Sequence, residues 1–110
     1  MINLQYLGFP SYDITECGKV WSRHSNRYLT MSISMQHHDK YGKYMLSQNG
    51  KRRFITAHRL VAFSYLEKPY GKDYVNHIDG DIHNNHVSNL EWVTALENNM
   101  HSIKHVKKPQ

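Results

Sequence analysis

The chain has 110 residues, enough to bury a hydrophobic core but too few for two independent domains, so we expect one compact unit. Its single cysteine, Cys17, excludes a disulfide framework and any cysteine-based zinc site. The longest unbroken apolar run, Leu60 to Phe63, is far too short to cross a bilayer, and no stretch resembles a signal peptide. We therefore expect a soluble, cytoplasmic protein that does not engage a membrane.

The formal net charge of +5 conceals an asymmetry along the chain. From Lys19 to Lys72 there are eleven basic residues and two acidic ones, whereas from Asp73 to Glu97 there are five acidic residues and no Lys or Arg. A protein that binds nucleic-acid phosphates on one surface and a cation on another would use such a division. A solvated basic face on an ordinary small protein would give the same pattern, so charge alone does not decide.

The first clear strand signal runs from Arg27 to Met35. Apolar residues at Leu29, Met31 and Ile33 alternate with polar ones, which predicts a half-buried strand.

The Asn49-Gly50 pair is the strongest hairpin signal, because a tight two-residue turn needs positive φ at both positions. It predicts that residues 43–48 pair with residues 51–56, with Met45 opposite Phe54. The second strand then carries three consecutive basic residues, Lys51, Arg52 and Arg53. They form either a DNA-facing ridge or a simply exposed one.

A short helix is expected after Thr56, which can act as its N-cap. Ala57, Leu60 and Val61 share the buried face, and the chain breaks at Pro69. His58 and Arg59 should lie off that buried stripe. We interpret His58 as a structural, hydrogen-bonding histidine and Arg59 as a candidate phosphate contact.

The last third of the chain predicts two strands and a helix. Tyr74 to Ile78 and Leu90 to Val93 are apolar-rich segments on either side of a polar loop rich in Asn and Asp. Thr94 and Glu97 have the spacing of a capping box, so a helix should begin there. Asn98 then lies in the opening turns of that helix.

The side chains of this region suit metal-assisted hydrolysis. His77 can take up a proton near neutral pH, while Asn76, Asn89 and Asn98 offer oxygens to a hard cation or to the second nitrogen of the imidazole. Neighbouring residues on a regular strand point to opposite faces. Asn76 and His77 could therefore converge on one phosphate only if the strand ends or kinks between them.

The run VNHIDGDIHNNHVSNLEWVT, followed by ALENN, resembles the HNH homing endonucleases, a class of His-Me finger nucleases. The resemblance implies a ββα-metal motif, in which two antiparallel strands and a helix clasp one divalent ion. It implies that His77 is the general base, that Asn89 orients it, and that Asn98 and Asn76 bind the metal. In that family the residue before the base is usually Asp or His, so Asn76 is a neutral and weaker ligand.

The resemblance extends upstream of the nuclease motif. Residues 57–66 resemble the helix that commonly precedes it, and residues 8–14 with 18–22 resemble the small module that often opens such endonucleases. Together these features imply an α+β fold, with an N-terminal antiparallel sheet and one helix followed by the ββα-metal motif. Residues 1–56 would contact DNA, and residues 57–110 would hold the helix and the nuclease motif within one compact unit.

The function implied is that of a metal-dependent DNA endonuclease from a phage or mobile element. It would use Mg²⁺, or alternatively Mn²⁺, and would contact DNA through Lys51, Arg52, Arg53 and Arg59. If the gene belongs to a phage, the site of action is the host cytoplasm. The neutral Asn76 motivates a second reading, a non-catalytic DNA-binding protein on a degenerate HNH scaffold. A third, a protein-interaction or inhibitor domain, has no positive sequence feature.

Overall fold

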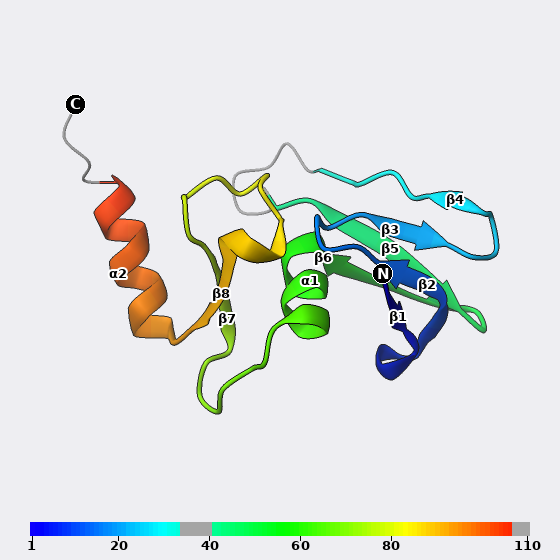
Figure 1. Cartoon of the computed structure of the whole chain (residues 1–110), viewed down its shortest axis with the longest axis horizontal. Coiled ribbons are helices and arrows are strands. Elements are labelled where there is room, and N and C mark those ends of the chain that lie inside the picture. The colour runs from blue at the N-terminus through cyan, green and yellow to red at the C-terminus, as the bar shows by residue number, and fades with distance from the viewer. Residues whose placement is uncertain (34–40, 107–110) are drawn as a thin grey trace.

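The computed structural model describes residues 1–33 and 41–106, with the side chains of the last helix described as far as residue 100. The strands are β1 (Ile2–Leu4), β2 (Phe9–Ile14), β3 (Val20–Ser22), β4 (Arg27–Tyr28), β5 (Lys43–Gln48), β6 (Lys51–Thr56), β7 (Tyr74–His77) and β8 (Leu90–Val93). The helices are α1 (Ala57–Tyr65) and α2 (Ala95–Val106), with short 3₁₀ turns η1 (Gln5–Leu7) and η2 (Val87–Asn89). The chain is thus α+β, and Figure 1 shows the strand pair β7–β8 between α1 and α2.

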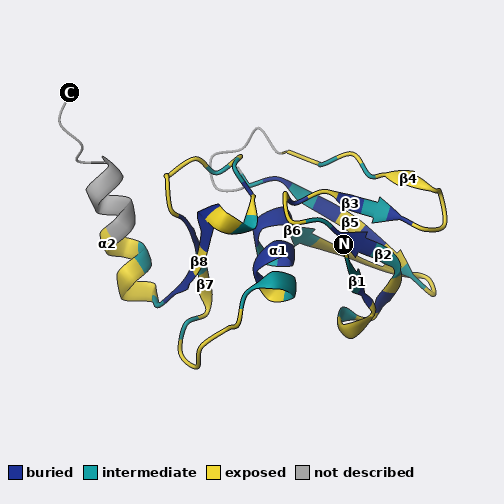
Figure 2. Cartoon of the chain, in the orientation of Figure 1, coloured by how far each residue is buried: buried dark blue, intermediate teal, exposed yellow. Residues whose placement is uncertain are grey.

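The N-terminal strands form a four-stranded antiparallel sheet in the order β1-β2-β3-β4. Ile2 pairs with Ile14, and Tyr12 pairs with Ser22. Leu4, Ile14 and Val20 are fully buried, and Figure 2 shows the buried residues gathered where this sheet meets α1 and β5. One side of the sheet therefore supplies part of the hydrophobic core.

The prediction of one long strand from Arg27 to Met35 is wrong. The strand ends at Tyr28, and beyond it Ser32 makes an isolated bridge to Lys43; residues 34 and 35 lie outside the described part of the chain. Leu29 and Met31 do face the core, but Ile33 is exposed. Beyond β4 the chain leaves the N-terminal sheet and reaches the edge of β5. The alternating apolar residues therefore mark burial at Leu29 and Met31 but do not form a continuous strand.

The β5–β6 hairpin confirms its prediction. Lys43 pairs with Thr56 and Gln48 with Lys51, and Met45 lies opposite Phe54. Asn49 and Gly50 have φ of 52° and 78°, the positive values that such a turn requires.

Helix α1 begins after Thr56, as predicted, although the buried Thr56 hydroxyl makes no capping hydrogen bond and has no partner among the described residues. The expectation that His58 lies off the buried face is wrong, because only 8% of His58 is exposed. The sheet covers one side of α1 and the β7–β8 pair covers another. The buried stripe expected from the sequence assumes that α1 packs on one side only. It therefore misses His58, which is buried on the second packed side.

A single hydrophobic core contains residues from both parts of the chain, 1–56 and 57–110. Leu4 and Leu46 from the N-terminal strands pack in the same cluster as Leu60, Val61 and Leu90. Within the described residues, no helix is long and apolar enough to span a membrane.

The turn between β2 and β3 packs directly against the loop that joins β7 to β8. A Cβ at Gly18 would approach the Asn85 Cβ to 2.8 Å, so this contact admits only glycine without a shift of the loop. The Val87 N–H donates to the Glu16 carbonyl over 2.8 Å, and the buried Tyr44 hydroxyl donates to the Gly18 carbonyl over 2.8 Å. The N-terminal sheet thus supports the β7–β8 loop.

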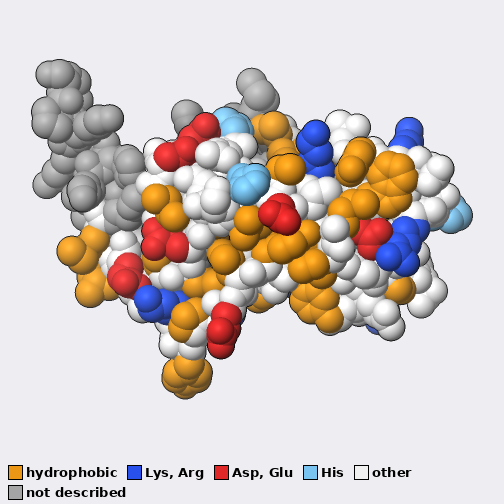
Figure 3. Space-filling view, viewed as in Figure 1, with side chains coloured by type: hydrophobic (Ala, Val, Ile, Leu, Met, Phe, Trp, Pro, Cys, Tyr) orange, Lys and Arg blue, Asp and Glu red, His pale blue; other side chains and the backbone are white. Residues whose placement is uncertain are grey.

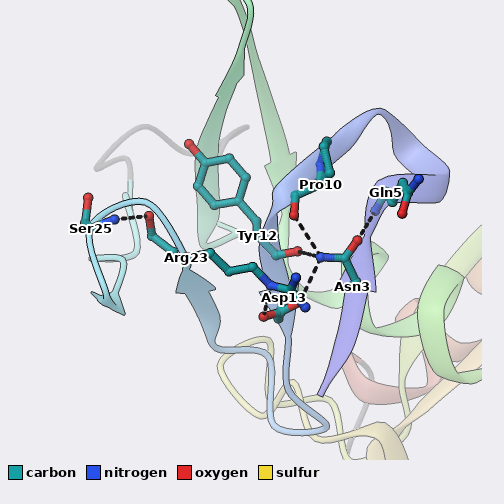
Figure 4. Close-up of polar contacts among 8 residues, drawn as sticks. Asn3, Gln5, Pro10, Tyr12, Asp13, Arg23 and Ser25 are labelled. Carbon is teal, nitrogen blue, oxygen red and sulfur yellow. Dashed lines mark hydrogen bonds and ion pairs between the residues drawn. The ribbon is translucent and has the colours of Figure 1, made fainter.

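A buried carboxylate organises the outer part of the N-terminal sheet (Figure 4). Asp13 is 6% exposed and accepts from the Arg23 Nε over 2.9 Å and from the Asn3 Nδ2 over 2.9 Å. The Arg23 hydrogen bond, reinforced by Asn3, holds the pKa of Asp13 below its ordinary value of 3.8 despite the opposing effect of burial.

This lowered pKa predicts how stability depends on pH. A carboxyl with a folded pKa below its unfolded value stabilises the fold above the unfolded pKa and loses that effect as pH falls through the folded one. Arg23→Met should therefore lower the free energy of unfolding at neutral pH, and its deficit relative to wild type should shrink below about pH 4. Urea denaturation at several pH values measures this. Arg27→Met is the control, and a deficit that persists at low pH would contradict the ion pair.

Candidate active site

Strands β7 and β8 divide the candidate site into two faces. Their register pairs Asn76 with Glu91 and His77 with Leu90. Because side chains alternate along a strand, His77 and Trp92 share one face, and Asn76 and Glu91 share the other. His58 and Phe63 of α1 contact the first face, and α2 packs against the strands from the other side. The strand does not end between Asn76 and His77.

His77 is the last residue of β7 and is 5% exposed. Its ring stacks on Tyr41, with centroids 6.0 Å apart and planes at 9°, and lies 5.0 Å from the ring of His58. Tyr41 and His58 are themselves 4.8 Å apart. The rings of Tyr41, from the segment before β5, and of His58, from α1, thus fix the plane of the His77 imidazole.

Asn85 makes the side-chain hydrogen bond to the imidazole. Its Oδ1 lies 2.9 Å from the His77 Nε2, and both residues are buried. Because an amide oxygen can only accept, Nε2 carries the proton and donates it. In the neutral ring the lone pair is then on Nδ1, the tautomer that leaves Nδ1 able to accept a proton.

Asn89 holds the loop. Its Nδ2 donates to the Asp79 Oδ1 over 2.9 Å and to the Asn84 carbonyl over 3.0 Å, while its Oδ1 accepts from the Asp79 N–H over 3.0 Å. The Asp81 N–H, then the Asn84 and Asn89 amides, keep the pKa of Asp79 below its ordinary value. The imidazole contact expected of Asn89 is made by Asn85 in this geometry, and the side-chain hydrogen bonds of Asn89 stay within the loop.

The Asn76 side chain is 6% exposed, and its Nδ2 donates to the Glu91 Oε2 over 3.0 Å. This bond joins directly opposed residues of the two strands.

Helix α2 begins with the predicted capping box. The Thr94 N–H donates to the Glu97 Oε1 over 2.9 Å, and the Glu97 N–H donates to the Thr94 Oγ1 over 3.1 Å. The Asn98 N–H donates to the Thr94 carbonyl over 2.9 Å, which fixes Asn98 one turn into the helix. Asn98 is half-buried, on the helix that packs against Asn76's face of the strands.

The donor atoms on this face suit a hard divalent cation. Asn76 and Asn98 offer amide oxygens, which Mg²⁺ and Mn²⁺ accept. Among the described residues, no three or more His, Cys, Asp or Glu side chains gather into a group that could hold a metal ion.

Comparison with known proteins gives a consistent result. The sequence model of the HNH endonuclease family matches residues 56–100, the segment that contains His77 and the asparagines around it. The HNH endonuclease L245 of Acanthamoeba polyphaga mimivirus is 43% identical over 94 residues, 86% of this chain and 28% of L245. The DNA endonuclease I-HmuI of Bacillus phage SP01 is 35% identical over 92 residues, 81% of this chain and 51% of I-HmuI.

A solved structure shows the same fold. The I-HmuI structure, which describes DNA binding and cleavage by that HNH homing endonuclease, superposes with a TM-score of 0.80 at 30% identity. The match covers 94% of this chain and 58% of the I-HmuI chain. The chain belongs to the HNH endonuclease family. It spans about half the length, or less, of the curated HNH relatives that it matches.

Three of the predicted DNA contacts of this HNH chain lie on β6. Lys51, Arg52 and Arg53 are exposed and border a hollow of ≈ 580 Å³ beside the β5–β6 turn. On the face shown in Figure 3, most Lys and Arg lie towards the end formed by the N-terminal strands, and acidic side chains gather over β7, β8 and the start of α2.

Arg59 has structural contacts. Its guanidinium lies 5.3 Å from the Phe63 ring and 5.7 Å from the Trp92 ring, and Nη1 donates to the Asp73 carbonyl over 3.2 Å. These contacts tie α1 to β8 and to the segment that leads into β7, so they account for Arg59 without DNA. A phosphate contact remains a prediction for this residue.

His58, like Asn85 and Tyr41, contacts the imidazole of His77 although the sequence did not assign it to the site. Burial, then the neighbouring His77 and Arg59, lower its pKa from 6.5 to about 3, so it is neutral at physiological pH. A neutral neighbour matters because two imidazolium rings 5.0 Å apart would repel each other. His58 therefore packs on His77 as a neutral ring.

The neutral state of His58 predicts a pH effect on stability. Because its folded pKa lies below its unfolded value, the unfolded chain binds more protons, and stability should fall as pH drops from about 6.5 towards 3. His58→Phe keeps a ring but cannot take up a proton. Between pH 7.5 and 5 its free energy of unfolding should therefore fall by on the order of 2 kcal/mol less than that of wild type. Urea denaturation at both values measures the difference. If wild type and His58→Phe lose the same unfolding free energy between pH 7.5 and 5, the pKa of His58 is not lowered in the folded protein.

Proposed function

We propose that this chain hydrolyses phosphodiester bonds of DNA with the help of one divalent ion, Mg²⁺ or alternatively Mn²⁺. The observation that carries the proposal is the hydrogen bond from the His77 Nε2 to Asn85, which leaves a basic Nδ1 at the end of β7. Membership of the HNH endonuclease family supports it. The setting would be the cytoplasm of a host cell, as for an enzyme of a phage or mobile element.

His77 acts as the general base. Its Nδ1 takes a proton from water, and the resulting hydroxide attacks the phosphorus while the bond from phosphorus to the 3′ oxygen breaks and that oxygen takes a proton from solvent. The products are a 5′ phosphate and a 3′ hydroxyl. Asn85 holds the tautomer, the rings of Tyr41 and His58 hold the plane of the imidazole, and Asn89 secures the loop behind it.

Asn76, on the face of β7 that α2 covers, and Asn98, on α2, would hold the divalent ion through their amide oxygens. When bound, such an ion stabilises the charge that develops on the phosphate and on the leaving oxygen. His77 and Asn76 lie on opposite faces of β7, and Asn98 lies on α2. Because β7 ends at His77, the reacting phosphate would have to reach around the end of the strand to meet both the base and the ligands.

DNA binding is assigned to the basic side chains of β6. Lys51, Arg52 and Arg53 are consecutive on an exposed hairpin, with Arg52 on the opposite face of β6 from the other two, and each can neutralise a phosphate. Phe54 follows them, with 56% of its surface exposed and the Lys43 ammonium 5.2 Å from its ring.

A second function, DNA binding without catalysis, is favoured by one observation. Asn76 brings no charge to the cation. Cleavage of supercoiled plasmid in the presence of Mg²⁺, abolished by EDTA, supports the nuclease; binding without cleavage supports the alternative.

The first test of the mechanism removes the base. His77→Ala should lower the cleavage rate by about 10²- to 10⁴-fold, the usual contribution of a positioned base, while DNA affinity persists. Plasmid cleavage and a gel-shift titration measure the two quantities. His24→Ala, which removes an exposed histidine, is the control. A His77→Ala variant that cleaves at the wild-type rate rules out this base.

The role of Asn85 is tested with the same assays. Asn85→Leu removes the acceptor and should lower the rate by about tenfold or more, whereas Asn85→Asp keeps an acceptor and should retain more activity. Asn89→Ala should mainly lower the melting temperature. If Asn89→Ala slows cleavage at unchanged stability while Asn85→Leu does not, Asn89 orients the imidazole directly.

The basic row on β6 is tested through salt dependence. Replacing Arg52 and Arg53 with Ala should weaken binding to all sequences alike, because interactions with phosphates carry no sequence information. The slope of log affinity against log salt should flatten by roughly one unit for each phosphate that is no longer neutralised. Lys68→Ala, which removes a cation already paired with Asp73, should leave the slope unchanged. An unchanged slope in the double variant would place the DNA elsewhere.

A further inference from the structure

Glu91 lies directly opposite Asn76 on the neighbouring strand, and we infer that it completes the divalent-ion site. It holds the Asn76 amide so that Oδ1 is the atom offered to the cation, and it supplies the negative charge of the site. The inference rests on the proposed metal-dependent function and extends it to a residue on β8.

The charge of the ligand set calls for such a residue. Asn76 and Asn98 are both neutral amides. Mg²⁺ gives up its hydration shell reluctantly and is usually bound through one or two carboxylates. Two amide oxygens leave the charge of the cation without a protein counter-charge, so a carboxylate close to Asn76 would change the affinity substantially.

The hydrogen bond between the two residues fixes the orientation of the ligand. The Asn76 Nδ2 donates to the Glu91 Oε2 over 3.0 Å, and Asn76 is 6% exposed, so its amide has little freedom to turn. With the nitrogen facing Glu91, Oδ1 is the atom left to accept or coordinate. A carboxylate that accepts an amide hydrogen also polarises the amide and strengthens its oxygen as a donor.

The other carboxylates of the acidic segment have different partners. Asp73 pairs with Lys68, and Asp79 accepts from the Asn84 and Asn89 amides. Asp81 accepts from the His83 N–H, and Glu97 caps α2 through Thr94.

Glu91, by contrast, has the Asn76 amide as its partner and is exposed. Among the described residues, the ion pairs of carboxylates with Lys or Arg involve Asp13, Asp73 and Glu97. The charge of Glu91 is therefore available to a cation on this face.

The test is Mn²⁺ binding to the whole chain without DNA, measured by isothermal titration calorimetry, with melting curves recorded with and without metal. Glu91→Gln preserves shape and removes the charge, so it should weaken Mn²⁺ affinity by about tenfold or more while the metal-free melting temperature stays the same. The double variant Asn76→Asp with Glu91→Gln moves the carboxylate to the other strand and should restore affinity. Glu67→Gln, an exposed carboxylate after α1, is the matched control.

The outcomes separate this inference from the proposed function. If Glu91→Gln binds Mn²⁺ as wild type does while Asn98→Ala binds it weakly, Glu91 has no role and the metal site stands. Failure of the double variant to recover affinity would also overturn the inference, because the loss would then come from altered packing. If the wild-type chain binds no Mn²⁺, the inference and the proposed metal site fall together.

Discussion

The antiparallel register of β7 and β8 is the constraint on which the candidate site depends. It places His77 beside Leu90 and Asn76 beside Glu91, and the alternation of the strand sends these two pairs to opposite faces. One face meets α1 and the other meets α2. A slip of one residue would exchange the faces, so His77 would lose its ring neighbours and Asn76 would turn away from α2.

The loop between these strands gives its asparagines separate tasks. Asn85 contacts the imidazole, whereas Asn89 and Asn84 bind Asp79 and close the loop around it. Because amides donate and accept at once, a few of them can satisfy backbone and side-chain groups in a short, mostly irregular segment. The polar composition of the loop is therefore a structural requirement as much as a chemical one.

Local signals predicted much of this fold. The Asn49-Gly50 turn set the β5–β6 register, and Thr94 with Glu97 set the start of α2, because both depend on residues near each other in the chain. The contacts of His58, Asn85 and Glu91 arise between segments brought together by tertiary packing. Neither periodicity nor spacing contains that information, and the same limit explains the failed strand beyond Tyr28.

The close approach of Gly18 to Asn85 bears on how such a protein can be rearranged by recombination. The turn that carries Gly18 belongs to the N-terminal sheet, while Asn85 belongs to the segment that holds the base. A crossover that joined this sheet to the nuclease segment of another relative would bring together two surfaces shaped separately. Only partners that keep a glycine at this turn, or a loop displaced to make room, would preserve the imidazole contact. The two halves of the chain therefore have to match at this contact.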